Sequence, residues 1–342
     1  MISHCVDACV ARLAASDAFR SKRDIARLAR VVDSAPKSTR DWREQGERIA
    51  LGDDAAAIPD GSGYLLFAAE GILPEFLDGD PYFAGWSSVM VNVNDIAAMG
   101  GAPMAVVDVY CHSPSSAAEA VVSGIRDACS AYGVPLVGGH TTCRESGPHA
   151  LAVAILGRAE HLLTSFGARV GDVILFAVDL RGSYRGDFPF WNATAGRSAE
   201  SLRADLAVFG KLAAAGGVRA CKDVSNAGIA GTLLMLLETS GVGALLDLDR
   251  VPRPSGVELD RWLLSFPSYG FLLSATPEDA PSVQTSVQER GLACEAVGRV
   301  EDSSELWLAS RGERALLWDL ARRPFTGFGA VRRSVPHSGG ET

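Results

Sequence analysis

The residues best suited to chemistry in this sequence are acids that follow glycine or lie inside apolar segments. Asp53 and Asp54 follow Gly52 in GDDAAAI, and Asp95 interrupts the apolar run VNVNDIAAMGG at 91–101. Adjacent acids often mark only a turn, and a buried carboxylate is costly unless something compensates its charge. For Asp95 the alternatives are an arginine partner, a cap hydrogen bond or a divalent cation, which prefers oxygen ligands.

Helical spacing places Asp95 beside a second polar group. Apolar residues recur at helical intervals over 82–99, so we predict a helix there that ends at the glycine pair after Met99. Asn92 and Asp95 are three residues apart and therefore share one face of that helix. The apolar neighbours indicate that Asp95 is not on a freely solvated face, so its charge needs compensation. The adjacent acids of GDDAAAI, which also suit a hard cation, favour a cation for that role.

Two further polar stretches are associated with predicted strands. Glu70 ends the strand predicted at 64–70 and adds another carboxylate. In VGGHTT at 137–142, glycines let the backbone approach a ligand closely, and threonine hydroxyls can bind phosphate oxygens. A turn that holds a structural histidine explains the same residues equally well.

The stretch CKDVSNAGIAGTLLMLLE at 221–238 combines an acid with the start of a predicted helix. Asp223 precedes the helix, and Ser225 or Asn226 is the expected N-cap. Small residues in the first turns of a helix allow an anion to approach its free N–H groups. Tight packing of the helix against a sheet is the alternative reason for these small residues.

The composition argues against some classes of function. The chain has 342 residues, is 47% hydrophobic and 21% charged, and carries a net charge of −9. A broad phosphate-binding surface, and hence a nucleic-acid partner, is therefore not expected. No apolar run is long enough to span a bilayer, so no membrane partner is expected, and the N-terminus lacks the basic start of a signal peptide.

Seven cysteines without a CxxC pair favour a reduced, cytoplasmic protein. Cys9 with His4 and Cys5 could hold a metal, although plain packing is the favoured alternative.

Strands and helices alternate through the first half of the chain, which predicts an α+β or α/β fold. We also predict an amphipathic helix at 16–33 within an N-terminal arm, and a break at 158–171 before a second block. The other predicted elements are strands at 64–70, 105–111, 135–139, 151–157, 171–180 and 292–300, and helices at 82–99 and 114–132.

A polar and aromatic loop at 181–197 is the best candidate for recognising an acceptor. Its aromatic and basic residues include Tyr184, Phe188, Phe190, Trp191, Arg181 and Arg185. Aromatic and guanidinium groups can hold a planar or anionic substrate. An ordered loop that packs its own aromatic side chains is the equal alternative.

Five stretches occur in a specific order between about Gly46 and Ser310: GDDAA, VNVNDIAAMGGAP, VGGHTT, a GR…GD pair and KDVSNAGIAGTL. Together they resemble the superfamily of aminoimidazole ribonucleotide (AIR) synthase, selenophosphate synthetase, thiamine-monophosphate kinase and the hydrogenase-maturation carbamoyl dehydratase. The resemblance implies an α+β fold with an N-terminal α+β domain, two of which pair into a β-barrel in a homodimer, and a C-terminal α/β domain. The implied organisation is a helical arm at 1–46, domains at 47–160 and 161–321, and a loose tail at 322–342.

The resemblance also implies ATP and Mg²⁺ in a cleft, with the γ-phosphate passing to a small acceptor or activating an oxygen. Matching positions give Asp54, Asp95 and Asp223 as catalytic residues, and Asp53, Asp54, Glu70, Asp95 and Asp223 as metal ligands. The implied nucleotide-binding residues are Gly52, Asp53, Asn92, Gly138, Gly139, His140, Thr141, Lys222, Ser225 and Asn226. Divalent ions that bridge carboxylates to phosphates would resolve the repulsion between an acidic pocket and ATP.

Several positions depart from the well-known relatives. Glu70 stands where many have Asp, His140 where thiamine-monophosphate kinases have Asp, and Asn226 where a second Asp is usual. The segment 34–51 lacks the reactive cysteine of selenophosphate synthetases. A kinase-like, ATP- and Mg²⁺-dependent phosphotransferase for a small metabolite is therefore the first hypothesis, since it needs no extra nucleophile. A nucleotide-binding regulatory or assembly subunit is the second, and an unrelated metal-dependent hydrolase, which would need paired histidines, ranks below both.

Overall fold

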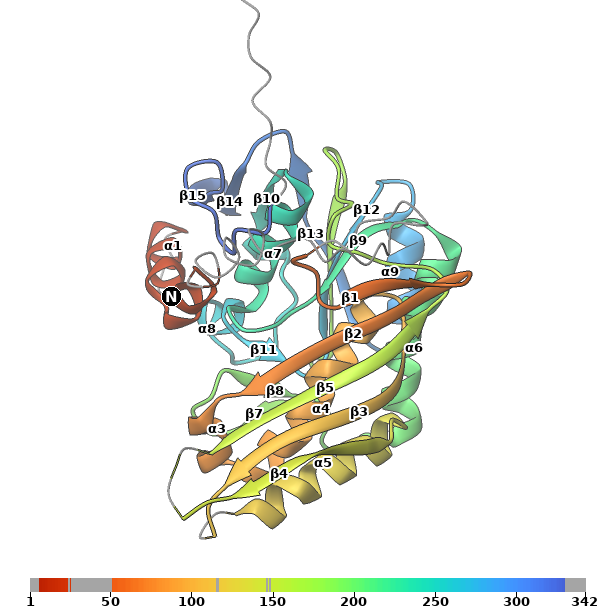
Figure 1. Ribbon diagram of the computed structural model, residues 1–342. Coiled ribbons are helices and arrows are strands. Elements are labelled where there is room, and N and C mark those ends of the chain that lie inside the picture. The colour runs from red at the N-terminus through yellow and green to blue at the C-terminus, as the bar shows by residue number, and fades with distance from the viewer. Residues whose placement is uncertain are drawn as a thin grey trace, which may run out of the picture.

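The fold is that of a computed structural model, which describes residues 6–23, 25, 51–114, 117–145, 147 and 149–329 (Figure 1). Two large sheets form the two halves of the described chain, and helices flank them. The N-terminal half contains β1 (Ala56–Asp60), β2 (Gly63–Ile72), α3 (Pro74–Gly79), α4 (Pro81–Ala98), β3 (Ala102–His112), α5 (Ala118–Tyr132), β4 (Leu136–Cys143) and β5 (Ala150–Ala159). The C-terminal half contains β6 (Val173–Val178), β7 (Ser183–Tyr184), β8 (Phe190–Asn192), α6 (Ala199–Ala215), β9 (Val218–Asp223), α7 (Gly228–Ser240), β10 (Gly243–Asp247), η2 (Leu248–Arg250), α8 (Leu259–Leu263), β11 (Phe266–Pro267), β12 (Gly270–Ala275), α9 (Ala280–Gln288), β13 (Ala293–Glu301), β14 (Glu305–Ser310) and β15 (Glu313–Asp319).

The N-terminal sheet is open and runs in the order β1-β2-β5-β3-β4. Along β2, Leu66 and Ala68 are buried while Phe67 between them is exposed, because successive side chains of a strand point to opposite faces. The helices α4 and α5 cover the buried face, behind the sheet in Figure 1. A Cβ at Gly85 of α4 would lie 2.0 Å from the carbonyl oxygen of Val121 in α5, so glycine is what allows the two helices to pack this closely.

The opposite face of this sheet carries exposed apolar side chains. Phe67, Met104, Val107 and Val109 are 52%, 46%, 40% and 50% exposed. The described part of the chain therefore leaves this face uncovered, which is unusual for apolar side chains gathered on one surface. One chain forms an open sheet, so the β-barrel implied by the family resemblance would need a second copy.

The C-terminal sheet runs in the order β15-β14-β10-β13-β6-β12-β9. Its central strands β6 and β12 are almost wholly buried, as their continuous apolar sequences require. One hydrophobic cluster joins the apolar side chains of α4 to Phe209 of α6 and Phe271 of β12, so the core continues across both halves. The edge strand β9 lies against α4, and this contact brings the two halves together at the site described below.

The N-terminal arm is helical where it is described. Helix α1 (Val6–Ala15) and a helical segment at 17–23 pack beside β14 and β15 (Figure 1). Phe19 is fully buried, and its ring centroid lies 5.3 Å from that of Phe325 and 6.2 Å from that of Trp318. The arm is thus docked on the C-terminal half by an aromatic cluster.

Part of the prediction for the N-terminus lies outside the described residues. This applies to 26–33 of the helix predicted at 16–33 and to His4 and Cys5 of the alternative metal site. Cys9 is buried, and burial raises the pKa of its thiol to about 11, which agrees with the packing alternative. Among the described helices, none is both long and apolar enough to cross a membrane.

The segment after β15 differs from the loose tail expected from residue 322. Glu238 of α7 is buried and accepts the backbone N–H groups of Phe325 and Thr326 at 2.7 Å each. Phe325 itself is fully buried. A buried carboxylate that is satisfied by backbone donors holds this segment in place, a long-range interaction that composition alone does not reveal.

Candidate functional site

Three acids from distant parts of the sequence meet where the two halves join. Asp54 precedes β1, Asp95 lies in α4 and Asp223 ends β9. One carboxylate oxygen from each lies within 4.8 Å of the others. Asp95 and Asp223 are 6% and 2% exposed, so like charges are crowded together away from water. We call these three residues the acid cluster.

Lys222 partly neutralises the acid cluster. Its side chain is 6% exposed and its Nζ pairs with Asp54, whose side chain is 4% exposed. The backbone N–H of Asp223 also donates to Asp54 Oδ2 at 3.2 Å. A single buried lysine beside three carboxylates leaves an excess of negative charge, which a bound cation would remove.

Asp95 is the acid whose hydrogen-bonding capacity the protein satisfies least. Its Oδ2 is buried and has no hydrogen-bond partner among the described residues. Burial, followed by the charges of Asp223, Glu70 and Asp54, raises the pKa of Asp95 well above its usual range. The described structure contains neither an arginine partner nor a cap hydrogen bond for this carboxylate. An orphaned buried oxygen beside two other carboxylates fits the oxygen ligands that Mg²⁺ takes.

Asp53 points away from the acid cluster. Its carboxylate oxygens accept the backbone N–H of Ser165 at 3.0 and 3.2 Å, and one accepts that of Asp54 at 3.1 Å. Burial and the charge of Asp54 raise the pKa of Asp53 to about 6. These bonds hold the loop that carries Asp53, and Asp53 is not among the three acids whose oxygens converge. Its expected role as a metal ligand stays a prediction. Gly52 supplies the turn before it, with φ of +103°.

Glu70 lies at the rim of the acid cluster on β2. It is exposed and is not among the acids whose oxygens converge within 4.8 Å. Desolvation by the surrounding protein raises the pKa of Glu70, while the charges of Lys22 and Lys222 oppose that shift. The carboxylate of Glu70 therefore interacts electrostatically with the acid cluster but is not one of the converging groups.

Asn92 shares a helical face with Asp95 but has its own partners. Its Nδ2 donates to the carbonyl oxygens of Ser88 at 2.8 Å and of Val153 at 3.1 Å. These bonds tie α4 to β5, and the side chain is completely buried. The Nδ2 bonds therefore help to hold the helix that carries Asp95, while Asn92 Oδ1 is buried without a partner among the described residues. The nucleotide-binding role expected for Asn92 stays a prediction.

The predicted residues Gly138, Gly139, His140 and Thr141 are not brought to the acid cluster within one chain. They lie on β4, an exposed edge strand, whereas Glu70 lies on β2. Strands β5 and β3 lie between the two. Three strand spacings separate β2 from β4, or roughly 14 Å. The order of strands in the sheet, which no local pattern encodes, is the reason for the separation.

The loop between β9 and α7 passes the acid cluster. Ser225 or Asn226 was the expected N-cap, but α7 begins at Gly228 and its N-cap is Ala227, which makes no side-chain cap bond. Ala227 is fully buried with φ of 83°, a left-handed conformation that is strained for a residue with a side chain. Asn226 Oδ1 accepts the N–H of Ala227 at 3.0 Å. A strained loop at a helix N-terminus beside converging acids is typical of a binding site.

The aromatic loop at 181–197 packs largely upon itself and its neighbours. Phe188 and Phe190 stack with ring centroids 5.6 Å apart, and both lie beside Phe76 of α3. Arg185 pairs with Asp80, with its Nε 2.7 Å from Oδ2. These contacts favour the packing alternative over the recognition of an acceptor.

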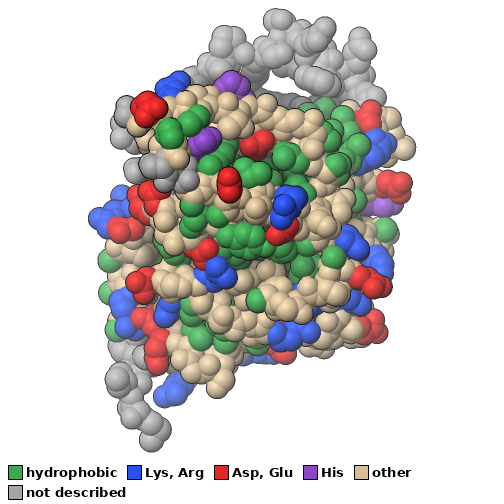
Figure 2. All heavy atoms as spheres, turned by 90° about the horizontal axis from the view of Figure 1, so that it is seen from below, with side chains coloured by type: hydrophobic (Ala, Val, Ile, Leu, Met, Phe, Trp, Pro, Cys, Tyr) green, Lys and Arg blue, Asp and Glu red, His purple; other side chains and the backbone are tan. Residues whose placement is uncertain are grey.

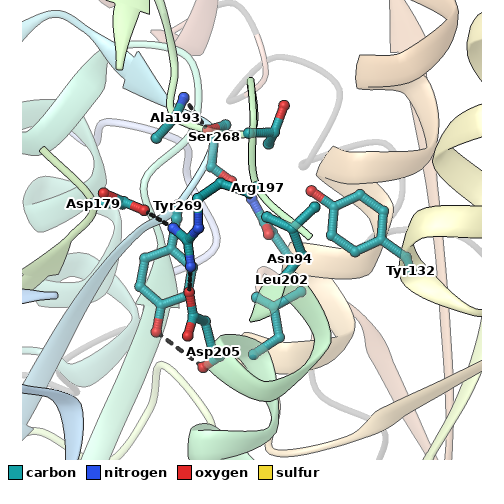
Figure 3. A pocket seen from close by; sticks show the side chains of 11 residues that line it. Asn94, Tyr132, Asp179, Ala193, Arg197, Leu202, Asp205, Ser268 and Tyr269 are labelled. Atoms are coloured by element: carbon teal, nitrogen blue, oxygen red, sulfur yellow. Dashed lines mark hydrogen bonds and ion pairs between the residues drawn. The ribbon is translucent and has the colours of Figure 1, made fainter. Parts of the chain in front are cut away.

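A buried ion network that the sequence analysis did not anticipate joins this loop to α6 (Figure 3). Arg197 lies between the carboxylates of Asp179 and Asp205, each of which is 2% exposed. Asn94 and Tyr132 of the N-terminal half line the same small pocket. The three charged residues belong to no motif and all lie in the C-terminal half, so their pairing holds the loop at 181–197 against α6 and the end of β6.

One face of the molecule carries charged side chains of both signs (Figure 2). Figure 2 shows acidic and basic side chains interspersed over the face seen from below, with no area of basic side chains alone. A nucleic-acid surface would instead gather Lys and Arg on one face.

Comparison with known proteins agrees with the sequence resemblance. The family profile described as "AIR synthase related protein, N-terminal domain" matches residues 52–159, and that of the corresponding C-terminal domain matches 192–308. The "Uncharacterized protein sll0787" of Synechocystis sp. is 48% identical over 284 residues, which is 83% of this chain and 88% of that protein. A selenide, water dikinase of Aeromonas salmonicida is 26% identical over 76% of this chain and 79% of its own length.

Several solved structures of other proteins have the same fold as this chain. Thermotoga maritima PurL complexed with ATP matches with a TM-score of 0.69 and 20% identity, over 84% of this chain and 49% of that chain. AaThiL complexed with AMPPCP and TMP matches with a TM-score of 0.58 and 20% identity, over 78% of this chain and 90% of that one. This chain thus spans about half the length of PurL. At such identities the likeness establishes two AIR synthase-like domains of mixed α and β structure.

Proposed function

The chain belongs to the family of AIR synthase related proteins, and from this we propose that it is an ATP- and Mg²⁺-dependent phosphotransferase acting on a small metabolite. Related members of the family are ATP-dependent enzymes, including the selenide, water dikinase. Structures with the same fold were obtained with ATP in PurL and with AMPPCP in AaThiL. These relatives support a nucleotide as the ligand of the acid cluster.

The observation that carries the proposal is the convergence of Asp54, Asp95 and Asp223 with one buried, unpartnered oxygen. Carboxylates in this arrangement repel a triphosphate unless a metal ion lies between them. In the proposal these three acids hold Mg²⁺, which would neutralise phosphate charge and polarise the transferred group. A donor set made only of carboxylates suits Mg²⁺ better than a metal that prefers nitrogen or sulfur.

In the proposal the other groups near the acid cluster hold the acids and the phosphates in place and do not themselves react. Lys222 holds Asp54 in place, and the backbone N–H of Asp223 fixes its second oxygen. In the proposal the N-terminus of α7, which follows the strained Ala227, would supply backbone N–H donors to a phosphate. Phosphoryl transfer depends chiefly on positioning and charge neutralisation, so no covalent nucleophile is required.

Calorimetric titration with ATP in Mg²⁺ and in EDTA tests the nucleotide part of this proposal. We expect binding with a Kd of about micromolar order in Mg²⁺, and at least ~10-fold weaker binding in EDTA because the acids then repel the phosphates. ADP release that a small-metabolite extract stimulates would identify turnover. Affinity for ATP that is absent, or is the same with and without Mg²⁺, would contradict the proposal.

A nucleotide-binding regulatory or assembly subunit is the second candidate. It is favoured by Asn226, which stands where relatives usually have an acid and whose amide contacts Ser21 and its own loop. Tight Mg²⁺-dependent ATP binding without turnover on any metabolite fraction would select this alternative.

The uncovered sheet face leads to a prediction about assembly. We propose that two copies pair through this face as a homodimer, which would also bring β4 of one copy towards the acid cluster of the other. Val109→Asp should then give a monomer, because a carboxylate would be buried between apolar surfaces. Val122→Asp is the matched control, since Val122 of α5 is also 50% exposed but lies outside the sheet. Light scattering after gel filtration measures the mass, and a wild-type monomer or a dimeric Val109→Asp variant would refute this pairing.

A further inference from the structure

Three segments of the N-terminal half meet at the end of its sheet where β5 begins. Strands β3 and β5 are antiparallel, with Cys111 opposite Ala150, so the residues after β3 lie beside those before β5. Strand β2 pairs with β5 on the other side, with Ile72 opposite Leu151, and α3 closely follows β2. This order of strands brings together Asp78 of α3, Ser113 after β3 and His149 before β5 (Figure 1).

The histidine lies between the acid and the serine. His149 Nδ1 is 2.8 Å from Asp78 Oδ1, and His149 Nε2 is 3.4 Å from Ser113 Oγ. The backbone N–H of Ser113 also donates to Nε2, at 3.5 Å. A carboxylate accepts from a protonated nitrogen, so Nδ1 carries the hydrogen and Nε2, which faces an N–H donor, is the acceptor. This is the tautomer in which an imidazole can take a proton from a hydroxyl group.

The exposure of the three side chains suits a reaction at the protein surface. The side chain of His149 is 18% exposed, whereas that of Asp78 is 66% exposed and Ser113 is partly exposed. The protein thus holds the imidazole in place, while the hydroxyl group can be reached from solvent. None of these residues belongs to the acid cluster or to the motifs that identified the family.

We propose that Ser113, His149 and Asp78 form an acyl-transfer site whose substrates are activated esters of small carboxylic acids. A nucleophile, a base and an orienting acid in hydrogen-bonded sequence are what this chemistry requires, and a long distance between nucleophile and base is common before a substrate binds. An open site favours small esters with a good leaving group, because few contacts are available to position a larger substrate. The site shares no residue with the acid cluster and needs neither ATP nor Mg²⁺.

The reaction has two halves. In the first, Ser113 Oγ attacks the carbonyl carbon of the ester while His149 Nε2 takes its proton. The bond from that carbon to the leaving oxygen breaks, and this oxygen takes the proton from Nε2 and departs as an alcohol. In the second, water attacks the acyl-serine and gives a proton to Nε2, the bond from the acyl carbon to Oγ breaks, Oγ recovers the proton and a carboxylic acid leaves. Asp78 is a positioning residue, because it acts only by keeping the hydrogen on Nδ1.

A fluorophosphonate probe and p-nitrophenyl acetate test this site on the full chain. A reactive serine displaces fluoride from the probe to form a stable phosphonate ester, which peptide mass spectrometry locates, and release of p-nitrophenol measures turnover. Ser113→Ala removes the nucleophile and His149→Gln removes the base. Ser130→Ala is the matched control, because Ser130 is an exposed serine on α5 of the same half.

We expect wild type and Ser130→Ala to carry the phosphonate on Ser113 and to release p-nitrophenol at the same rate. Ser113→Ala and His149→Gln should each lower the rate by about 100-fold. The melting temperature should stay within about 2 °C of wild type for all three variants, so that a lost rate reports chemistry and not unfolding. A wild-type protein without an adduct on Ser113, or a Ser113→Ala variant as fast as wild type, would overturn the proposal.

Two substitutions of Asp78 test its orienting role. An asparagine amide can donate to Nδ1 and move the hydrogen to Nε2, so Asp78→Asn should lower the rate about 10-fold, a smaller loss than in a buried triad because water also solvates this acid. Asp78→Glu keeps a carboxylate and should recover most of the rate. KM should stay near the wild-type value in both, because Asp78 does not touch the ester. Equal rates for wild type and Asp78→Asn would contradict the arrangement, as would equal losses in the two variants.

Discussion

Asp95→Asn should reduce the affinity for Mg²⁺–ATP by at least ~100-fold while making the metal-free protein more stable. The loss follows because asparagine keeps the shape of the side chain but removes the charge that a divalent cation needs. The gain follows because Asp95 is 6% exposed and lies within 4.8 Å of two other carboxylates. Relieving one such charge is worth about 1–3 kcal/mol in the free energy of unfolding.

The gain should depend on pH in a definite direction. Burial and neighbouring acids raise the pKa of Asp95 well above the usual value of 3.8 in the folded protein. A raised pKa means that the folded state holds its proton more tightly than the unfolded state does. Below the unfolded value the two proteins should therefore differ least in stability. The advantage of Asp95→Asn should grow as pH rises from about 4 through the folded pKa, and should then level off.

Two measurements check this prediction. Calorimetry gives the affinity for Mg²⁺–ATP, and thermal unfolding in EDTA at several pH values gives the stability. Asp302→Asn is the control, because Asp302 is exposed and should change neither quantity. A variant that binds Mg²⁺–ATP as tightly as wild type would exclude Asp95 as a ligand, and a less stable metal-free variant would contradict the account of charge repulsion.

Local periodicity was enough to predict the elements that carry much of the site. The strands predicted at 64–70 and 151–157 lie within β2 and β5, and the helix predicted at 82–99 nearly coincides with α4. In each case a regular apolar pattern extends over the element, and glycine marks the end of α4. Strand β9, which carries Lys222 and Asp223, was not predicted, because it is short and its charged end resembles a loop.

The arrangement of the site depended on features that sequence spacing does not encode. Two adjacent acids, Asp53 and Asp54, were both expected among the metal ligands, but Asp53 accepts the backbone N–H of Ser165 and Asp54 pairs with Lys222. The VGGHTT residues were grouped with the acids, although the order of strands places them on an edge away from the cluster. The contact of Lys22 with Ser225 had no signal in the sequence, because it forms only when the arm folds onto the loop before α7. Ordered motifs identified the family, but tertiary contacts decide which side chains meet.

Lys222→Met should give a protein whose stability depends on added divalent cation. Lys222 is buried and pairs with Asp54. Although burial lowers it, the negative charges of Asp54 and Asp53 raise the pKa of Lys222 overall, so the side chain is charged at neutral pH. Removing it leaves a buried carboxylate without its counter-ion, which typically costs about 3–5 kcal/mol in the free energy of unfolding.

Thermal and urea unfolding in EDTA and in millimolar Mg²⁺ measure this dependence. In EDTA the variant should melt about 10 °C below wild type. Mg²⁺ should recover a substantial part of that loss, because an ion that binds the folded state alone stabilises it by mass action. Lys211→Met, on the exposed surface of α6, should behave as wild type in both buffers. A Lys222→Met protein that is as stable as wild type in EDTA would show that the buried pair is not needed for the fold.

The double variant Asp54→Asn/Lys222→Met distinguishes the loss of a counter-ion from the loss of packing. If the single variant is unstable because Asp54 is left charged and unpaired, removing that charge should restore most of the stability in EDTA. The double variant should then gain little from Mg²⁺, because one of its three carboxylates is gone. Failure of Asp54→Asn to restore stability would assign the defect to packing around β9. Equal responses to Mg²⁺ in the single and double variants would remove Asp54 from the proposed metal ligands while leaving Asp95 and Asp223 to be tested alone.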